Sequence, residues 1–135
     1  MTEEQNVNAT TDEPTAQSAA PEYDPQDIEK NKTVAGLAYI LFFLPFIACP
    51  ESKFGRFHAN QGLVLLITNV AGWIVLSVIS TIITLIIPLL GLFLFPVLGF
   101  VFGVLILVLV IMGLVNGLGG KAAPLPVIGK IKILK

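Results

Sequence analysis

The chain has 135 residues, of which 55 % are hydrophobic and only 13 % are charged, and its formal net charge is −1. Its mean hydropathy of +0.86 lies well above that of soluble globular domains, which excludes an ordinary water-soluble composition. The single cysteine, Cys49, excludes an internal disulfide. Eight of the nine acidic residues lie in residues 1–29, whereas six of the eight basic residues follow Pro50.

Residues 1–29 are polar, acidic and rich in Thr, Ala, Pro and Gln. Such a segment cannot bury enough apolar surface to offset the entropy of ordering, so we predict a disordered acidic tail here and a transmembrane helical domain over 30–135. An acidic tail that binds a partner is the functional alternative. The first 27 residues lack the basic start and apolar core of a secretory signal peptide, so the internal segments must drive insertion.

Residues 33–50 form an 18-residue stretch without charge. As a helix it would rise about 27 Å, barely enough for a bilayer core of about 30 Å. Pro45 lies inside this stretch and removes a backbone donor, which can kink or end a helix. We predict a short, Pro-kinked first transmembrane helix over 33–48, with a re-entrant segment as the alternative.

A charged interruption over 49–61 separates this stretch from the next, and Ser52 is a candidate cap for the helix that follows. Its side chains pair at helical spacing, Arg56 with Asn60 and His58 with Gln61. Two interpretations remain open, a polar recognition patch at the membrane surface and a helix entry anchored among headgroups.

The 59 residues from Gly62 to Gly120 contain no Asp, Glu, Lys, Arg or His. Because a span needs about 20 residues, two spans fit and three leave no turns. Pro88, Gly91 and Pro96 favour a break in the middle. We predict helices over 56–87 and 94–118 joined by an apolar turn over 88–95; a four-span version that splits 62–95 is the alternative topology.

Residues 121–135 form a basic tail in which Ile and Lys alternate, so the lysines can lie against anionic headgroups. With three spans the positive-inside rule places six basic residues on one side and two on the other, and four spans give the same ratio. With a re-entrant first helix all eight basic residues lie on one side. All three arrangements place the C-terminal tail in the cytoplasm, so we expect a multi-pass protein of the cytoplasmic membrane.

Each of the two long helices carries one face of special residues at helical spacing. The first face is polar and consists of Asn69, Trp73, Ser77, Ser80 and Thr84. The second face is rich in glycine and consists of Gly99, Gly103, Ile106, Val110, Gly113 and Gly117. Small residues and interhelical hydrogen bonds hold helices together in lipid, so we expect these faces to pack on each other, with a partner protein or a second copy as the alternative.

The sequence offers little for catalysis, because it has one His, one Cys and no acidic residue after Glu51. A catalytic constellation or a metal site needs several such side chains within reach of each other. We therefore expect no enzyme, no metal site, no cofactor and no nucleic-acid partner. The expected partners are membrane lipids and other membrane subunits or further copies of the chain.

Two stretches are similar to a known family: Lys-Phe-Gly-Arg-Phe-His-Ala-Asn-Gln-Gly over 53–62, and Pro-Leu-Pro-Val-Ile-Gly-Lys over 124–130. They resemble the small bacterial membrane proteins related to Tic20, a subunit of the chloroplast inner-envelope import machinery. The resemblance covers about 33–132 and implies an architecture more than an activity. It implies that the positions matching the family form the functional or assembly surface, namely Arg56, His58, Asn60, Gln61, Pro126 and Gly129.

The sequence thus predicts an all-α integral membrane bundle with three transmembrane helices. We expect a non-enzymatic accessory or scaffold subunit of a membrane complex, with a link to protein translocation implied by the resemblance. The alternative is an oligomeric pore or carrier assembled through the glycine face of the helix over 94–118.

Overall fold

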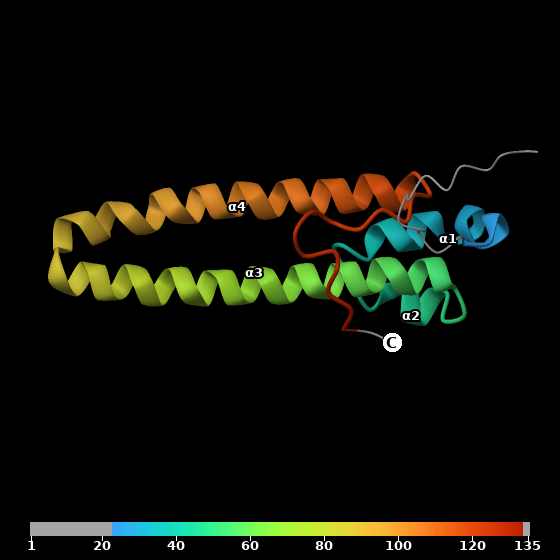
Figure 1. Cartoon of the computed structure of the whole chain (residues 1–135), viewed down its shortest axis with the longest axis horizontal. Coiled ribbons are helices and arrows are strands. Elements are labelled where there is room, and N and C mark those ends of the chain that lie inside the picture. Colours follow the sequence, from blue (N-terminus) through green and yellow to red (C-terminus); the bar gives the residue numbers. More distant parts are fainter. Residues whose placement is uncertain (1–22, 134–135) are drawn as a thin grey trace, which may run out of the picture.

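The structure, a computed structural model, describes residues 23–133, and it is all-α, as predicted. Its four helices are α1 (Pro25–Leu37), α2 (Leu44–Ala48), α3 (Lys53–Ile86) and α4 (Pro88–Leu118). The long helices α3 and α4 run antiparallel and side by side, and the short helices gather where α3 begins and α4 ends (Figure 1).

Helix α1 begins inside the segment that we predict to be a disordered tail. The Asp24 side chain caps it by accepting a hydrogen bond of 2.9 Å from the backbone N–H of Gln26, and Pro25 occupies the first turn, where no N–H donor is required. The predicted tail boundary at residue 29 is therefore wrong, because residues 25–29 are helical. The remainder of that prediction, residues 1–22, lies outside the described residues.

The predicted transmembrane helix over 33–48 is also wrong. Helix α1 ends at Leu37, and α2, which follows a turn, has only 5 residues. Pro45 lies in the first turn of α2, so it starts a helix and does not kink one. The turn after α1 packs tightly against α3, because a Cβ atom on Gly62 would overlap the carbonyl of Ala38. Two long helices remain, as in the alternative with a first segment that does not span.

The predicted helix over 56–87 is confirmed, with Lys53 and Ile86 as its observed ends, and α3 is unbroken through the region that the four-span version would split. The predicted turn over 88–95 is wrong, because Ile87 alone separates α3 from α4. Pro88 occupies the first turn of α4, where its missing N–H costs nothing. Gly91 serves close packing and not a break, since a Cβ there would overlap Thr84.

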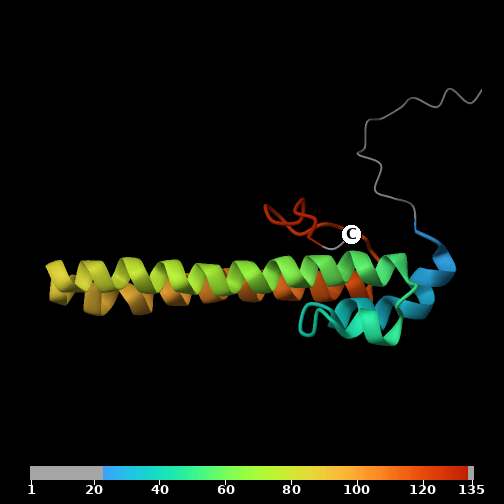
Figure 2. The ribbon, with the colours of Figure 1, turned by 90° about the horizontal axis from the view of Figure 1, so that it is seen from below.

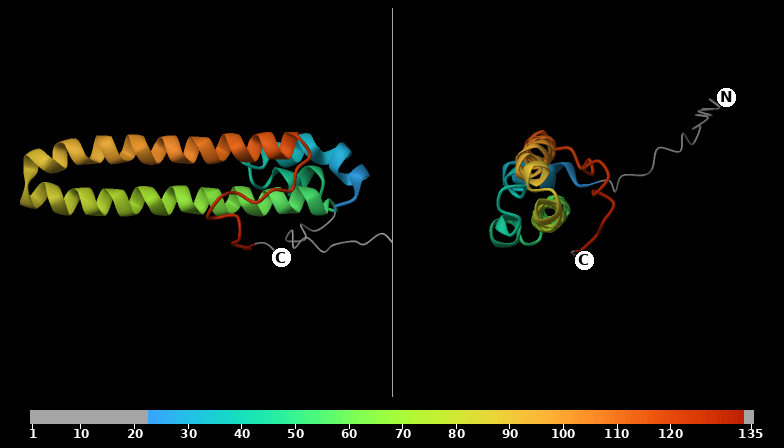
Figure 3. Two further views of the ribbon diagram at one scale, coloured as in Figure 1. Left: turned by 45° about the horizontal axis from the view of Figure 1, so that its top comes forward. Right: turned by 90° about the vertical axis from the view of Figure 1, so that its left-hand side faces the viewer.

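Burial divides the molecule into two parts. The packed end comprises α1, α2, residues 53–65 of α3, residues 113–118 of α4 and the segment that follows α4. The apolar hairpin comprises residues 66–112, and its only buried residues are the small ones Ser80, Gly91 and Gly99. Helices α1 and α2 flank one side of the packed end and the C-terminal segment flanks the other (Figures 2 and 3).

Two helices, α3 with 34 residues and α4 with 31, are long and apolar enough to cross a membrane. Their most apolar windows have mean hydropathies of 2.3 and 3.1, and only 17 % and 11 % of each window is buried inside the molecule. The core helix of a soluble protein is mostly buried, so these values favour helices that meet an apolar solvent.

Candidate functional site

The first turns of α3 bring together polar side chains that are buried. The Ser52 hydroxyl caps the helix, as predicted, and accepts a hydrogen bond of 2.9 Å from the backbone N–H of Gly55. One to three turns later His58, Asn60 and Gln61 are all less than 7 % exposed. Buried polar groups need partners, and the C-terminal segment, which we define as residues 121–133, supplies them.

The Gln61 carboxamide holds the C-terminal segment at two points. Its Nε2 atom donates to the carbonyl of Gly129 at 2.8 Å, and its Oε1 atom accepts from the backbone N–H of Leu125 at 3.1 Å. Both ends of the short loop between these residues are therefore fixed by one side chain. The loop also closes on itself, since the Gly129 N–H donates to the Leu125 carbonyl at 2.9 Å.

The Asn60 carboxamide makes the same kind of contact further along the segment. Its Nδ2 atom donates to the carbonyl of Ile131 at 2.9 Å, and its Oδ1 atom accepts from the N–H of Ile133 at 2.7 Å. A carbonyl and an N–H two residues apart are the groups that a neighbouring strand would pair with in a parallel sheet. The side chain thus takes the place of a strand and binds backbone, whatever the side chains of the segment are.

His58 connects three parts of the chain. Its Nε2 atom lies 3.0 Å from the carbonyl of Lys121, and its Nδ1 atom lies 2.9 Å from the hydroxyl of Tyr39. Since a carbonyl only accepts, we assign the proton to Nε2, and Tyr39 donates to Nδ1. Burial raises the pKa of the Tyr39 hydroxyl, which keeps it a donor. The rings of Phe54, Phe57 and Tyr39 surround the imidazole, with centroids 4.7, 5.0 and 5.6 Å away.

Four of the six residues singled out by the family resemblance meet at this network, namely His58, Asn60, Gln61 and Gly129. The other two lie at the surface. Arg56 is exposed and its Nε atom donates to the carbonyl of Pro50 at 3.1 Å, and Pro126 is exposed in the loop. Gly129 has to be glycine, since a Cβ there would overlap the backbone of Leu125.

We expected the glycine face of α4 to pack on α3. It packs instead on two different parts of the chain, α3 and the region of α1 and Tyr39. Gly99 lies under the ring of Trp73 of α3, with 3.1 Å between that ring and an added Cβ. A Cβ on Gly113 would overlap the ring of Tyr39, and one on Gly117 would overlap the backbone of Gly36 in α1. Gly103 alone among the four has nothing within 4 Å of an added Cβ.

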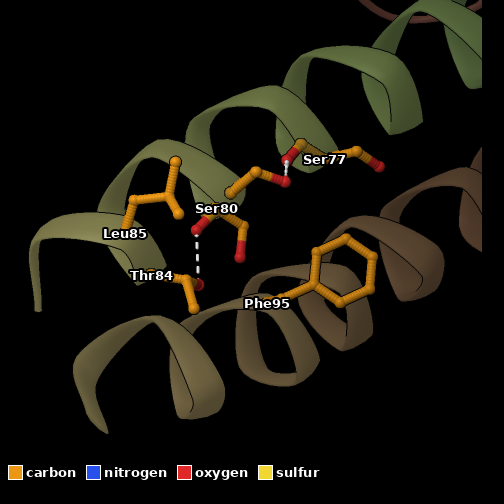
Figure 4. Close-up of a pocket in the computed structure, with 6 residues that line it drawn as sticks. Ser77, Ser80, Thr84, Leu85 and Phe95 are labelled. Atoms are coloured by element: carbon orange, nitrogen blue, oxygen red, sulfur yellow. Dashed lines mark hydrogen bonds between the residues drawn. The ribbon is translucent and has the colours of Figure 1, made fainter. Parts of the chain in front are cut away.

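The polar face of α3 differs from expectation as well. The hydroxyls of Ser77 and Thr84 donate within α3 and not to α4, each to the carbonyl four residues earlier, Trp73 and Ser80, both at 2.7 Å. Figure 4 shows the Thr84 bond together with the same kind of bond from Thr81 to the Ser77 carbonyl. These side chains line an open hollow of about 350 Å³, closed on the α4 side by Phe95. Asn69 lines a second hollow of about 220 Å³ nearer the packed end.

Two residues of this region could not be recognised from the sequence. Tyr39, which bonds His58, lies within the apolar stretch that we interpret as a span, and 19 residues separate the pair. Asp27 lies in the predicted tail, yet its carboxylate accepts from the N–H of Phe54 at 3.2 Å and joins α1 to the start of α3. Periodicity links residues of one helix, so it cannot reveal contacts between separate elements.

Asn60 and Gln61 of this arrangement bind polypeptide backbone. Among residues 23–133 no three His, Cys, Asp or Glu side chains gather as a metal ion would require. Comparison of the chain with models of protein families, with curated proteins and with solved structures found no match in any of the three.

Proposed function

We propose that the chain is a multi-pass protein of the cytoplasmic membrane, with the apolar hairpin in the lipid. The portions of α3 and α4 within the hairpin, 66–86 and 88–112, would rise about 32 and 38 Å, which suits a hydrocarbon core of about 30 Å. Their large side chains are exposed, among them Leu85 at 80 % and Phe100 at 74 %. In water this surface would far exceed the apolar patches of monomeric proteins, whereas in lipid it needs no cover.

The placement of charge supports an orientation with the packed end in the cytoplasm. Every Lys and Arg in residues 23–133 lies at the packed end: Lys30, Lys32, Lys53, Arg56, Lys121, Lys130 and Lys132. The hairpin has none. Because cytoplasmic flanks of spans carry an excess of basic residues, this distribution favours two spans with both flanks inside.

As to role, we propose a non-enzymatic accessory or scaffold subunit of a membrane complex. The observation that carries this is that the buried polar groups at the start of α3 are bonded to the chain's own C-terminal segment, so their polar atoms are occupied within the chain. The surface left for other subunits is the apolar hairpin. A link to protein translocation rests on the resemblance to the Tic20-related proteins and is part of the proposal.

A pore or carrier made of several copies is the second candidate. Uncovered Gly103 and the hydroxyl-lined hollow beside Ser77 favour it, because small residues and hydroxyls suit contacts between helices in lipid. The cover over Gly99, Gly113 and Gly117 disfavours it, since three of the four glycines already pack within the chain.

The membrane placement is tested with single cysteines in a Cys49→Ser background. Glu51→Cys and Lys130→Cys should react with a membrane-impermeant maleimide in inside-out vesicles and not in right-side-out ones. Reaction from both sides, or recovery of the protein as a soluble monomer without detergent, would overturn the proposal.

The two candidate roles are separated by crosslinking from the uncovered glycine. Gly103→Cys is compared with Leu105→Cys, an exposed position on the same helix (57 %) that points elsewhere. Disulfide-linked homodimers at 103 but not at 105 would favour the pore. A discrete heterologous product from either position, with no homodimer, would favour the accessory subunit.

A further inference from the structure

The C-terminal segment is held almost wholly by its backbone. Five hydrogen bonds join the described part of the segment to His58, Asn60 and Gln61, and each of the five ends on a carbonyl or N–H group of the segment. Leu125, which is 3 % exposed, and the half-buried Ile128 anchor the segment in the core. The side chains of Lys121, Pro126, Val127 and residues 130–133 are exposed.

The outward side chains are basic and apolar in turn. Lys121, Lys130 and Lys132 are exposed, and the one salt bridge within residues 23–133, Lys32 with Glu29, involves none of them. Ile131 is 50 % exposed. Apolar side chains interleaved with lysines suit the boundary between headgroups and acyl chains.

The tip of the loop adds a second observation. Val127 is 96 % exposed and has a φ of 67°, in the left-handed region that β-branched residues rarely adopt. The Gln61 bonds fix both ends of the loop, at Leu125 and Gly129, and the Val127 side chain projects from the loop between them. In Figure 1 the segment folds back from the end of α4 toward the hairpin turn and then bends and crosses α3, so its loop lies beside the boundary between the packed end and the apolar hairpin.

We propose that the C-terminal segment binds the anionic surface of the bilayer, with Lys130 and Lys132 on the headgroups and Val127 below them. This inference rests on the proposed membrane placement and names the lipid chemistry that the packed end takes. The acidic segment 1–22 is a competing occupant on charge, but Met1 and Val7 are its only large apolar side chains, which is little to cover Val127 and Ile131. A lipid interface satisfies both the charges and the apolar side chains.

The test places a fluorophore at the loop tip. Val127→Cys in the Cys49→Ser background is labelled with bimane, and the protein is reconstituted in nanodiscs containing doxyl-labelled lipid, either with phosphatidylcholine alone or with an equimolar mixture with phosphatidylglycerol. Quenching at 127 should be greater in the mixture. Each lysine near an anionic surface is worth roughly a fivefold change in the ratio of bound to free, so Lys130→Gln with Lys132→Gln should abolish the difference.

The outcomes separate the possible failures. Equal quenching in both lipids, or a difference that survives the double lysine change, would overturn the proposal. Quenching that appears only when the acidic residues of the N-terminal segment are neutralised would also overturn it and assign the surface to that segment; these residues are Glu3, Glu4, Asp12, Glu13 and Glu22. A label at Leu85→Cys in the hairpin should be quenched in both lipids, and its failure would refute the membrane placement itself.

Discussion

Among single residues, Gln61 ties the start of α3 to both ends of the loop in the C-terminal segment. It is 1 % exposed and it satisfies one donor and one acceptor of the C-terminal segment. Its removal would leave the Gly129 carbonyl and the Leu125 N–H buried and unpaired. Each such group costs about 1–3 kcal/mol.

We expect Gln61→Ala to release the C-terminal segment. A loss of about 2 kcal/mol or more raises the population of the released state at least tenfold, and proteolysis follows that population when opening is fast. The measurement is the initial rate of cleavage by a lysine-specific protease after Lys130 and Lys132 in detergent micelles. Asn69→Ala, which alters a carboxamide of the same helix that lines a hollow and not the segment, is the control and should leave the rate unchanged.

Asp27 gives the packed end a dependence on pH. Burial alone would raise the pKa of its carboxyl, but hydrogen bonds from Ser52, Asn31 and the backbone of Phe54 and Lys53 outweigh burial and lower the pKa below its usual 3.8. A carboxyl with a lowered pKa stabilises the folded state above its unfolded pKa, and this contribution disappears as the pH falls through the folded value. Docking of α1 on α3 should therefore weaken below pH 3.8.

Spin labels at Lys30→Cys and Lys53→Cys, again with Cys49→Ser, measure this docking by the distance between them. The distance distribution should broaden as the pH falls below the usual aspartate range. Asp27→Asn should show the broadened distribution at neutral pH and no further change in acid. A wild-type distribution that stays narrow down to pH values where all carboxyls are protonated would contradict the prediction.

Between elements, α1 and α4 pack backbone against backbone where Gly36 meets Gly117. A Cβ on Gly117 would overlap backbone atoms of Gly36, which cannot move aside as a flexible side chain could. Gly103, on the same helix, has free space around it. The two positions therefore form a matched pair of covered and uncovered glycine.

We expect Gly117→Val to destabilise the packed end by about 1–3 kcal/mol or more, since overpacking forces a backbone shift, and Gly103→Val to have little effect on the fold. Thermal unfolding in detergent, read as loss of the monomer peak in size-exclusion chromatography after heating, measures both. A Gly103→Val variant that is as unstable as Gly117→Val would show that the uncovered site is occupied by something in the folded protein.

The helices themselves were predictable to different degrees. Composition and periodicity suffice for α3, since the long uncharged run and the cap at Ser52 fix its extent. They fail for the first segment, because a proline such as Pro45 can kink a helix or begin one. In the structure Pro45 begins α2, and the turn before it packs against α3 through the contact of Ala38 with Gly62. The same ambiguity at Pro88 displaced the predicted start of α4.

Across the whole molecule, the sequence indicated the two long apolar helices and the residues of the polar site, but not the groups to which those residues bond. The residue types of His58, Asn60 and Gln61 stand out in an apolar chain. Their partners are backbone groups 63–73 residues away. Every residue has such groups, so the sequence does not show which of them a side chain will bind. We left two interpretations of this region open, a recognition patch and anchoring at headgroups. The structure favours neither, because the side chains of His58, Asn60 and Gln61 bind the chain itself.

The length of those connections bears on how the protein is made. Asn60 and Gln61 reach carbonyls that lie 71 and 68 residues further along the chain. When α3 leaves the ribosome, Tyr39 is already available to His58, but the backbone groups that Gln61 binds are made only after the whole hairpin. The packed end can therefore close only once residues 121–133 have been synthesised, and a nascent chain halted within α4 would leave the Gln61 carboxamide without the Leu125 and Gly129 groups that it bonds in the folded protein.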